Sequence, residues 1–153
     1  MRNSAPTGGA ATVGSVTDDP RRALERHQRV SAQAGVADVM IDYVLAHGHS
    51  YQASKRPKGE RKRKDGSCFE AAFRYVLRHP DHVYVEGFGM GPNGPPIHHA
   101  WAATPSGVVV DLVWPNPDEC TYFGVPFTAE EMTKDTKAKG LCTVLARAMA
   151  RGE

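Results

Sequence analysis

The stretch GSCFEAAFRYVL, residues 66–77, places a cysteine at the start of an amphipathic helix. Its apolar residues recur at helical spacing, which predicts one buried side. Ser67 stands where a helix-capping residue is expected, and Glu70 follows three positions later, as in a capping box. Pro80 ends the pattern, because proline cannot continue a helix. Cys68 is therefore predicted to lie in the first turn of a helix that packs on the core.

Downstream of this helix the apolar period changes from helical spacing to alternation. Strands are predicted over residues 83–88, 97–103 and 108–114, and the last two are joined by a hairpin loop at 105–107. Residues 115–127 are interpreted as a loop with aromatic anchors. The pattern predicts an α+β fold in which a small antiparallel sheet packs on helices.

Helical patterns flank this region on both sides. Asp19, followed by proline, opens a pattern that ends at Gly48 and that Gly35 can divide into two helices. Near the other end, Thr128 is predicted to cap a short helix, and residues 141–151 to form a last one. We see no internal repeat.

Length and composition are those of one globular domain. The chain has 153 residues, of which 41% are hydrophobic and 24% charged. Residues 1–19 are small and polar and are predicted to form a disordered tail, which leaves 20–153 as a single domain. No run of eighteen apolar residues and no secretory signal pattern is present, so we expect a cytoplasmic protein without a membrane span.

The three cysteines, Cys68, Cys120 and Cys142, are an odd number at irregular spacing. This argues against a disulfide framework, and the lack of a CxxC pair argues against a structural zinc site. We interpret Cys120 and Cys142 as packing residues and expect no metal or other cofactor.

The positive charge is concentrated in one segment, residues 55–65, which we call the basic loop. It holds seven of the 19 lysine and arginine residues and, with Glu60 and Asp65, carries +5 against +2 for the whole chain, so the remainder sums to −3. We expect an exposed loop that can contact an acidic partner through Lys55–Lys64. No aromatic residue interleaves these cations, which argues against nucleic acid as the partner.

Three residues carry a possible chemistry: Cys68 at a helix start, His99 in one predicted strand and Asp111 in the next. A helix N-terminus and a neighbouring imidazolium both stabilise a thiolate, which is the nucleophilic form of cysteine. A carboxylate behind the imidazole fixes its tautomer. A hairpin centred between residues 105 and 106 pairs positions that sum to about 211, which places Asp111 opposite residue 100, next to His99.

These residues resemble those of a known family. Gly66-Ser67-Cys68 opening a helix, His99-Ala100-Trp101 on a strand and Val110-Asp111-Leu112-Val113-Trp114 on the next are similar to the core of the transglutaminase-like branch of the papain-like cysteine enzymes. The resemblance covers residues 66–127. It implies a papain-like (transglutaminase-like) core with Cys68 as nucleophile, His99 as base and acid, and Asp111 as the orienting residue.

Two positions depart from the family pattern. Ser67 stands where a tryptophan commonly precedes the cysteine, and Lys62 stands where papain-type enzymes have a glutamine. Gln52 is a candidate for that missing side chain. Trp101 and Trp114 are further candidates for substrate contact, although buried tryptophans are more often core residues.

We therefore expect a cysteine-dependent acyl-transfer enzyme, a hydrolase of amide or peptide bonds that acts on a peptide or protein through a Cys68 thioester. Glutamine deamidation and amine transfer share the first half-reaction and remain open. The alternative is a non-catalytic binding module on a degenerate papain-like scaffold, which uses residues 55–64 to bind an acidic partner or nucleic acid. A metal site would have to use Cys68, Cys120 and Asp111 with the adjacent His98 and His99, whose side chains diverge on a strand.

Overall fold

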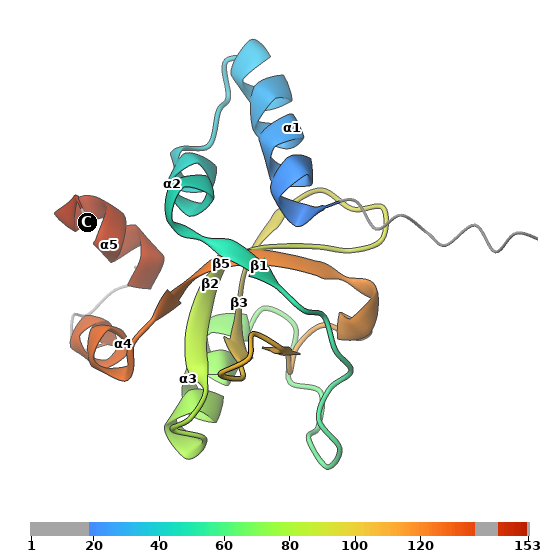
Figure 1. Cartoon of the computed structure of the whole chain (residues 1–153), viewed down its shortest axis with the longest axis vertical. Coiled ribbons are helices and arrows are strands. Elements are labelled where there is room, and N and C mark those ends of the chain that lie inside the picture. The colour runs from blue at the N-terminus through green and yellow to red at the C-terminus, as the bar shows by residue number, and fades with distance from the viewer. Residues whose placement is uncertain (1–18, 137–143, 153) are drawn as a thin grey trace, which may run out of the picture.

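The computed structural model describes residues 19–136 and 144–152 (Figure 1). The elements in chain order are α1 (Pro20–Gln33), α2 (Val39–His47), β1 (His49–Tyr51), α3 (Cys68–Arg78), β2 (Val83–Met90), β3 (Ile97–Ala103), β4 (Val109–Val110), a 3-10 turn (Pro117–Glu119), β5 (Thr121–Phe127), α4 (Ala129–Thr136) and α5 (Val144–Arg151). Cys142 and the expected tail up to residue 18 lie outside the described residues. Asp19 is described and caps α1 by accepting a hydrogen bond from the Arg21 backbone N–H.

The five strands form one antiparallel sheet in the order β1-β5-β2-β3-β4, which is curled (Figure 1). The α+β class with a small antiparallel sheet is thus confirmed. Strand β2 lies at the centre, and its register places Gly87 between His99 of β3 and Gly124 of β5.

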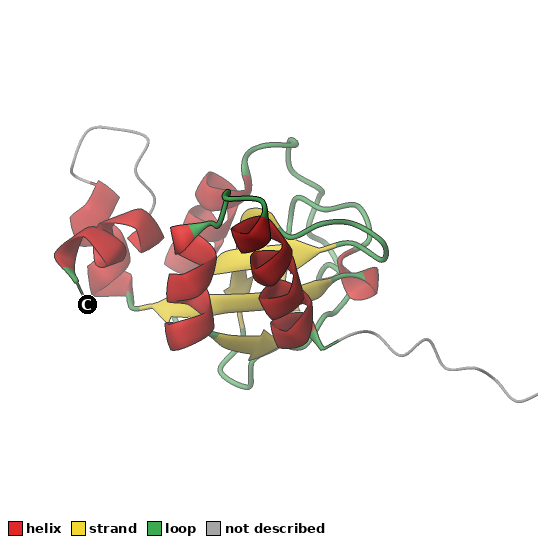
Figure 2. Cartoon of the chain, turned by 90° about the horizontal axis from the view of Figure 1, so that it is seen from above, coloured by secondary structure: helices red, strands yellow, loops and turns green. Residues whose placement is uncertain are grey.

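Helices cover one face of the sheet (Figure 2). All five contribute to a single buried apolar cluster with the side chains of this face, which include Tyr84, Phe88 and Phe123. Helix α3 packs mainly on β3 and also on β2. This packing brings the first turn of α3, with Cys68, to the strand that carries His99.

The opposite face carries a second cluster, in which aromatic rings lie against glycines. A Cβ atom at Gly124 would approach the Trp101 ring to 2.8 Å, and one at Gly89 would approach the Trp114 ring to 2.5 Å. A Cβ at Gly87 would overlap the backbone of β5. The glycines of β2 and β5 therefore make room for an aromatic layer that includes the His99 ring.

The sequence pattern found some strands and missed others. The predicted strand over 97–103 is confirmed, and the strand over 83–88 extends to Met90. The interpretation of 115–127 as a loop is wrong, because Thr121–Phe127 forms β5 between β1 and β2. Strand β1 was not predicted. Pro126 pairs with Val85 on the β2 side and lies beyond the end of β1, so a proline is tolerated in β5.

The predicted strand over 108–114 is much shorter in the structure. Only Val109–Val110 pairs with β3, with Val110 opposite Ala102 and Val109 opposite Ala103. This register is one residue off the predicted hairpin, and Asp111 lies just past the strand. Among the described residues no strand pairs with β3 alongside His99, and Asp111, just past β4, bonds the His99 ring.

Helix boundaries follow their predicted caps with one exception. Gly35 lies between α1 and α2, as expected, and Thr128 and Glu131 form a reciprocal capping box at the start of α4. The last helix begins at Val144 in the described part. The predicted cap of α3 is wrong, because the Ser67 side chain makes no capping hydrogen bond.

A search of the described residues for a helix that is both long enough and apolar enough to cross a membrane finds none.

Candidate active site

Cys68 is the first residue of α3, and the backbone before it leaves the helix end open. The Ser67 hydroxyl donates to the Lys64 carbonyl at 2.5 Å instead of accepting from the first turn. Glu70, the expected partner in the capping box, forms an ion pair with Arg74 at 2.7 Å. The first N–H groups of α3 therefore keep their hydrogen-bonding capacity and the positive end of the helix dipole beside the thiol.

His99 is held in place on β3 by its neighbours in the aromatic layer. Its ring stacks on the Trp114 ring, with centroids 4.2 Å apart and an interplanar angle of 18°. Trp101 and Tyr122 flank it at centroid distances of 6.1 and 6.3 Å. Only 2% of His99 is exposed, so the ring has little freedom to move.

Asp111 accepts four hydrogen bonds although it is buried. One carboxylate oxygen, Oδ2, accepts from His99 Nε2 at 2.7 Å and from the Tyr122 hydroxyl at 2.9 Å. The other oxygen, Oδ1, accepts from the backbone N–H groups of Val113 and Trp114 at 2.9 and 3.1 Å. The expected pairing of Asp111 with His99 is confirmed, and the carboxylate is saturated, which offsets the cost of its burial.

Cys68 completes a continuous set of contacts. Cys68 lies near enough to His99 that its hydrogen-bonding capacity and charge raise the pKa of the ring. Asp111 occupies Nε2, so Nδ1 is the ring nitrogen that remains for the thiol. Cys68 belongs to the apolar cluster on the helical face, whereas the His99 ring lies in the aromatic layer on the other face. Cys68 is buried apart from the 8% of it that is exposed.

The electrostatics favour a charged imidazole. Burial lowers the pKa of His99, but the hydrogen bonds and negative charges of Asp111 and Cys68 outweigh burial and raise the pKa to about 9. Burial raises the pKa of Asp111, but the hydrogen bond and charge of His99, with the two backbone N–H groups, bring it below its ordinary value. Burial and the Asp111 charge raise the pKa of the Tyr122 hydroxyl, which therefore stays a donor.

These shifts predict a dependence of stability on pH. The folded pKa of His99, about 9, lies above its ordinary value of 6.5, so the stabilisation is fully present below pH 6.5 and is lost as the pH rises through 9. We expect the free energy of unfolding of the wild type, relative to a His99→Gln variant, to fall by about 3 kcal/mol across this window. Urea denaturation of both chains at several pH values measures the difference, and parallel curves would contradict the shift. Asp111 acts in the opposite sense, since its contribution is present above its ordinary pKa and lost in acid.

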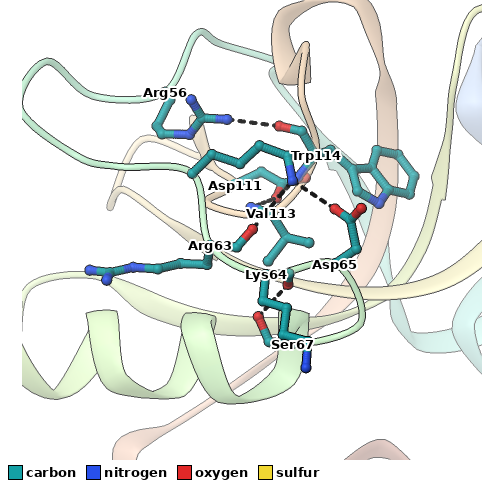
Figure 3. A network of polar contacts seen from close by, with 9 residues as sticks. Arg56, Arg63, Lys64, Asp65, Ser67, Asp111, Val113 and Trp114 are labelled. Carbon is teal, nitrogen blue, oxygen red and sulfur yellow. Dashed lines mark hydrogen bonds and ion pairs between the residues drawn. The ribbon is translucent and has the colours of Figure 1, made fainter.

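The basic loop packs against the segment that holds Asp111 (Figure 3). The Arg63 backbone N–H donates to the Leu112 carbonyl at 2.6 Å, and Arg56 Nη2 donates to the Trp114 carbonyl at 3.0 Å. Lys62 Nζ bonds Asp65 at 2.7 Å within the loop. The loop is exposed over much of its length, as expected, but these anchors tie it to the turn after β4 and to the start of α3.

Three further residues were expected near substrate. Trp114 contacts the His99 ring directly, and Trp101 is 1% exposed and packs edge-on against Tyr122 and Tyr51. Trp101 therefore packs as a core residue, and its contact with substrate stays a prediction. Gln52 is exposed, and its backbone bonds Gly107 and Val109 at the hairpin. These contacts do not bring Gln52 to the Cys68 site as a substitute for the glutamine of the papain type.

Tyr122 is the residue of this site that sequence reasoning missed. It is fully buried, shares Asp111 Oδ2 with His99 and lies near Cys120. The alternation of residues 121–127 carried the signal, because Tyr122 falls on the same face as Gly124 while Phe123 and Val125 fall on the other. A tyrosine on the face of a buried carboxylate is a natural donor to it.

A second buried carboxylate, Glu86, lies on the helical face of the sheet and is fully buried. It accepts from the Tyr84 hydroxyl at 2.7 Å and from the backbone N–H groups of Val144 and Leu145 at 2.9 and 3.2 Å. His98 Nε2 lies 3.7 Å from it, on the face opposite His99. Glu86 therefore caps α5 and attaches that helix to the sheet.

A hollow of about 300 Å³ lies beside the outer side of α3 and the end of the basic loop. Its lining residues are Arg63, Lys64, Ser67, Glu70, Ala71, Arg74 and Arg78. We call it the basic hollow. Cys68 does not line it, but Ser67 and Ala71 flank Cys68 on the first turn of the helix.

Among the residues that the structure describes, no three histidine, cysteine, aspartate or glutamate side chains are grouped so that they could hold a metal ion. Comparison of the chain with family models, with curated proteins and with solved structures finds no match. The function must therefore be argued from the geometry of the site.

Proposed function

We propose that this protein is a cysteine-dependent acyl-transfer enzyme that hydrolyses an amide or peptide bond through a thioester on Cys68, on a papain-like (transglutaminase-like) core. One observation carries the proposal. The His99 ring bonds Asp111 through Nε2, and Cys68 lies close enough to raise the pKa of the same ring, beside a helix N-terminus without a side-chain cap. A nucleophile, a proton carrier and an orienting carboxylate are thus in contact in the order that acyl transfer requires.

The first half-reaction forms the thioester. The Cys68 thiolate attacks the carbonyl carbon of the substrate, and the negative charge moves to the carbonyl oxygen. As the tetrahedral intermediate collapses, the carbon–nitrogen bond breaks, and the imidazolium of His99 gives its Nδ1 proton to the leaving amine. The amine departs, and the acyl group stays on sulfur.

The second half-reaction releases the acid. Neutral His99 takes a proton from water through Nδ1 while the water oxygen attacks the thioester carbon. Collapse breaks the carbon–sulfur bond, so a carboxylic acid leaves and Cys68 returns as the thiolate beside the imidazolium. If an amine replaces water, the same step gives amine transfer. We place hydrolysis first because nothing at the site marks a second substrate.

The open first turn of α3 provides the stabilisation of the intermediate. The Cys68 backbone N–H and its neighbours in that turn lie at the positive end of the helix dipole and have no capping side chain. An oxyanion formed at the sulfur can accept hydrogen bonds from them. The lack of a Ser67 cap thus supports the proposal.

The rates at which the cysteines are alkylated test the proposal. Cys120 is the internal reference, because burial and the Asp111 charge raise its pKa to about 11. With iodoacetamide at pH 7 and peptide mapping by mass spectrometry, we expect Cys68 to react at least about 100-fold faster than Cys120. Chain unfolded in urea, in which both should react alike, is the control.

The runner-up is the non-catalytic binding module that uses the basic loop for an acidic partner or nucleic acid. Two observations favour this alternative. The basic hollow offers a binding surface, and Cys68 is buried, with only 8% of it exposed to a substrate. In that case, Cys68 and Cys120 would be alkylated slowly and at similar rates in the folded chain, and replacing His99 with glutamine would leave the Cys68 rate unchanged.

A further inference from the structure

We propose that the basic hollow binds acidic side chains of the peptide substrate, on one side of the bond that Cys68 attacks. This inference rests on the proposed function and gives it a substrate class. The cations of the hollow come from α3, as Arg74 and Arg78, and from the end of the basic loop, as Arg63 and Lys64.

The charge of the hollow is one-sided. Four of its lining side chains are cationic, namely Arg63, Lys64, Arg74 and Arg78, and Glu70 is the one carboxylate. Arg74 pairs with Glu70 at 2.7 Å, and Arg63 approaches Glu60 at 3.9 Å. In the described part of the chain, Lys64 and Arg78 have no carboxylate partner. The hollow therefore keeps an excess of positive charge that an incoming acid can neutralise.

The hollow lies beside the helix turn that carries the nucleophile. Ser67 and Ala71 line it, and Ala71 also belongs to the buried cluster that contains Cys68. Arg74 and Arg78 follow Cys68 by six and ten residues, which a rise of 1.5 Å per residue converts to about 9 and 15 Å along the helix. An extended peptide covers that distance in about three to five residues. The acidic side chains should therefore lie about three to five residues from the scissile carbonyl.

The chemistry of the lining favours carboxylates on a peptide over a nucleic acid. Arginine presents a planar fork of donors that fits a carboxylate bidentately. None of the lining residues is aromatic, so bases would have no platform on which to stack. The volume of about 300 Å³ suits one or two side chains and not a polymer groove.

A binding measurement on the full chain with Cys68→Ala tests this inference without depending on turnover. The probe is a fluorescein-labelled peptide with glutamates about three to five residues from a central amide bond, and its glutamine counterpart is the blank. We expect fluorescence anisotropy to detect binding of the glutamate peptide. Arg74→Gln with Arg78→Gln should weaken it about tenfold, because two charge-assisted contacts are lost.

The matched control is Arg22→Gln with Arg29→Gln, which removes two exposed arginines of α1 and leaves the hollow intact. Unchanged binding in this control supports the hollow, and an equal loss would mean that net charge alone attracts the peptide. Tighter binding of a single-stranded oligonucleotide of the same charge, lost in the α3 variant, would overturn the peptide assignment. Cys68 alkylation in the Arg74→Gln/Arg78→Gln chain with its thiol intact tests the chemistry separately, so that either idea can fail alone.

Discussion

A chain in which Cys68 is replaced by alanine is expected to lose amide hydrolysis completely while keeping its fold. The thiolate is the protein group that forms a bond to the substrate carbon in the proposed reaction, so its removal leaves no route to the thioester. The side chain is small and already borders the surface, and its loss should cost only about 1 kcal/mol of unfolding free energy. Hydrolysis of a fluorogenic peptide library, with urea denaturation in parallel, measures both effects.

Cys120→Ala is the matched control for this variant. Cys120 is half-buried and contacts Tyr122, but it takes no part in the proposed reaction. We expect that chain to retain most of its activity. Wild-type turnover in Cys68→Ala would remove Cys68 from the reaction, and collapse of the fold would show that the residue is needed for packing instead.

Replacing Asp111 with asparagine is expected to lower activity by roughly three to four orders of magnitude. The asparagine oxygen can keep the bonds from the Val113 and Trp114 backbone, which leaves its NH₂ group facing His99 Nε2. That group donates, so neutral His99 must carry its own proton on Nδ1, towards Cys68. The ring can then no longer accept the thiol proton.

The measurement is the rate of hydrolysis, or of Cys68 alkylation, as a function of pH. Asp118→Asn is the control, because Asp118 is exposed and lies outside the site. Loss of activity in both variants would point to a general effect of charge. Wild-type activity in Asp111→Asn would remove the carboxylate from the proposed mechanism.

Part of this site could be predicted from the sequence because its members carry strong local signals. Cys68 precedes an apolar stripe at helical spacing, and Asp111 is a carboxylate in an apolar run, where an unpaired charge would be costly. A buried acid needs a partner, and His99 on the preceding strand was within reach. The predicted contact between Asp111 and His99 is correct although the predicted strand register is one residue off. Asp111 lies just past the last paired residue of β4 and bonds His99 from there.

Other parts were hidden by tertiary context. Strand β5 contains Gly124 and Pro126, which are poor strand residues on their own. The glycine is needed because the Trp101 ring lies against it, and the proline is tolerated because it lies past the end of β1. Missing β5 also meant missing Tyr122, the second donor to Asp111.

The predicted N-cap of α3 is wrong for a different physical reason. Ser67 has the side chain of a good N-cap residue, but its hydroxyl is taken by the Lys64 carbonyl in the preceding turn. Sequence preference cannot tell which of two nearby backbone groups a hydroxyl will bond. The hydrogen bonds that anchor the basic loop could not be predicted from the sequence either. Their acceptors are the main-chain carbonyls of Leu112 and Trp114, which every residue type carries.

The titration of the His99 ring tests the central claim most directly. In ¹⁵N-labelled protein followed by NMR, the account predicts an imidazolium that loses its proton at a pKa of about 9, because Asp111 and Cys68 both hold it. The same ring should titrate at lower pH in Cys68→Ala, since one of the two partners is gone. A ring that titrates near its ordinary value of 6.5, or that is unaffected by the loss of the thiol, would contradict the contact between Cys68 and His99 on which the proposed chemistry depends.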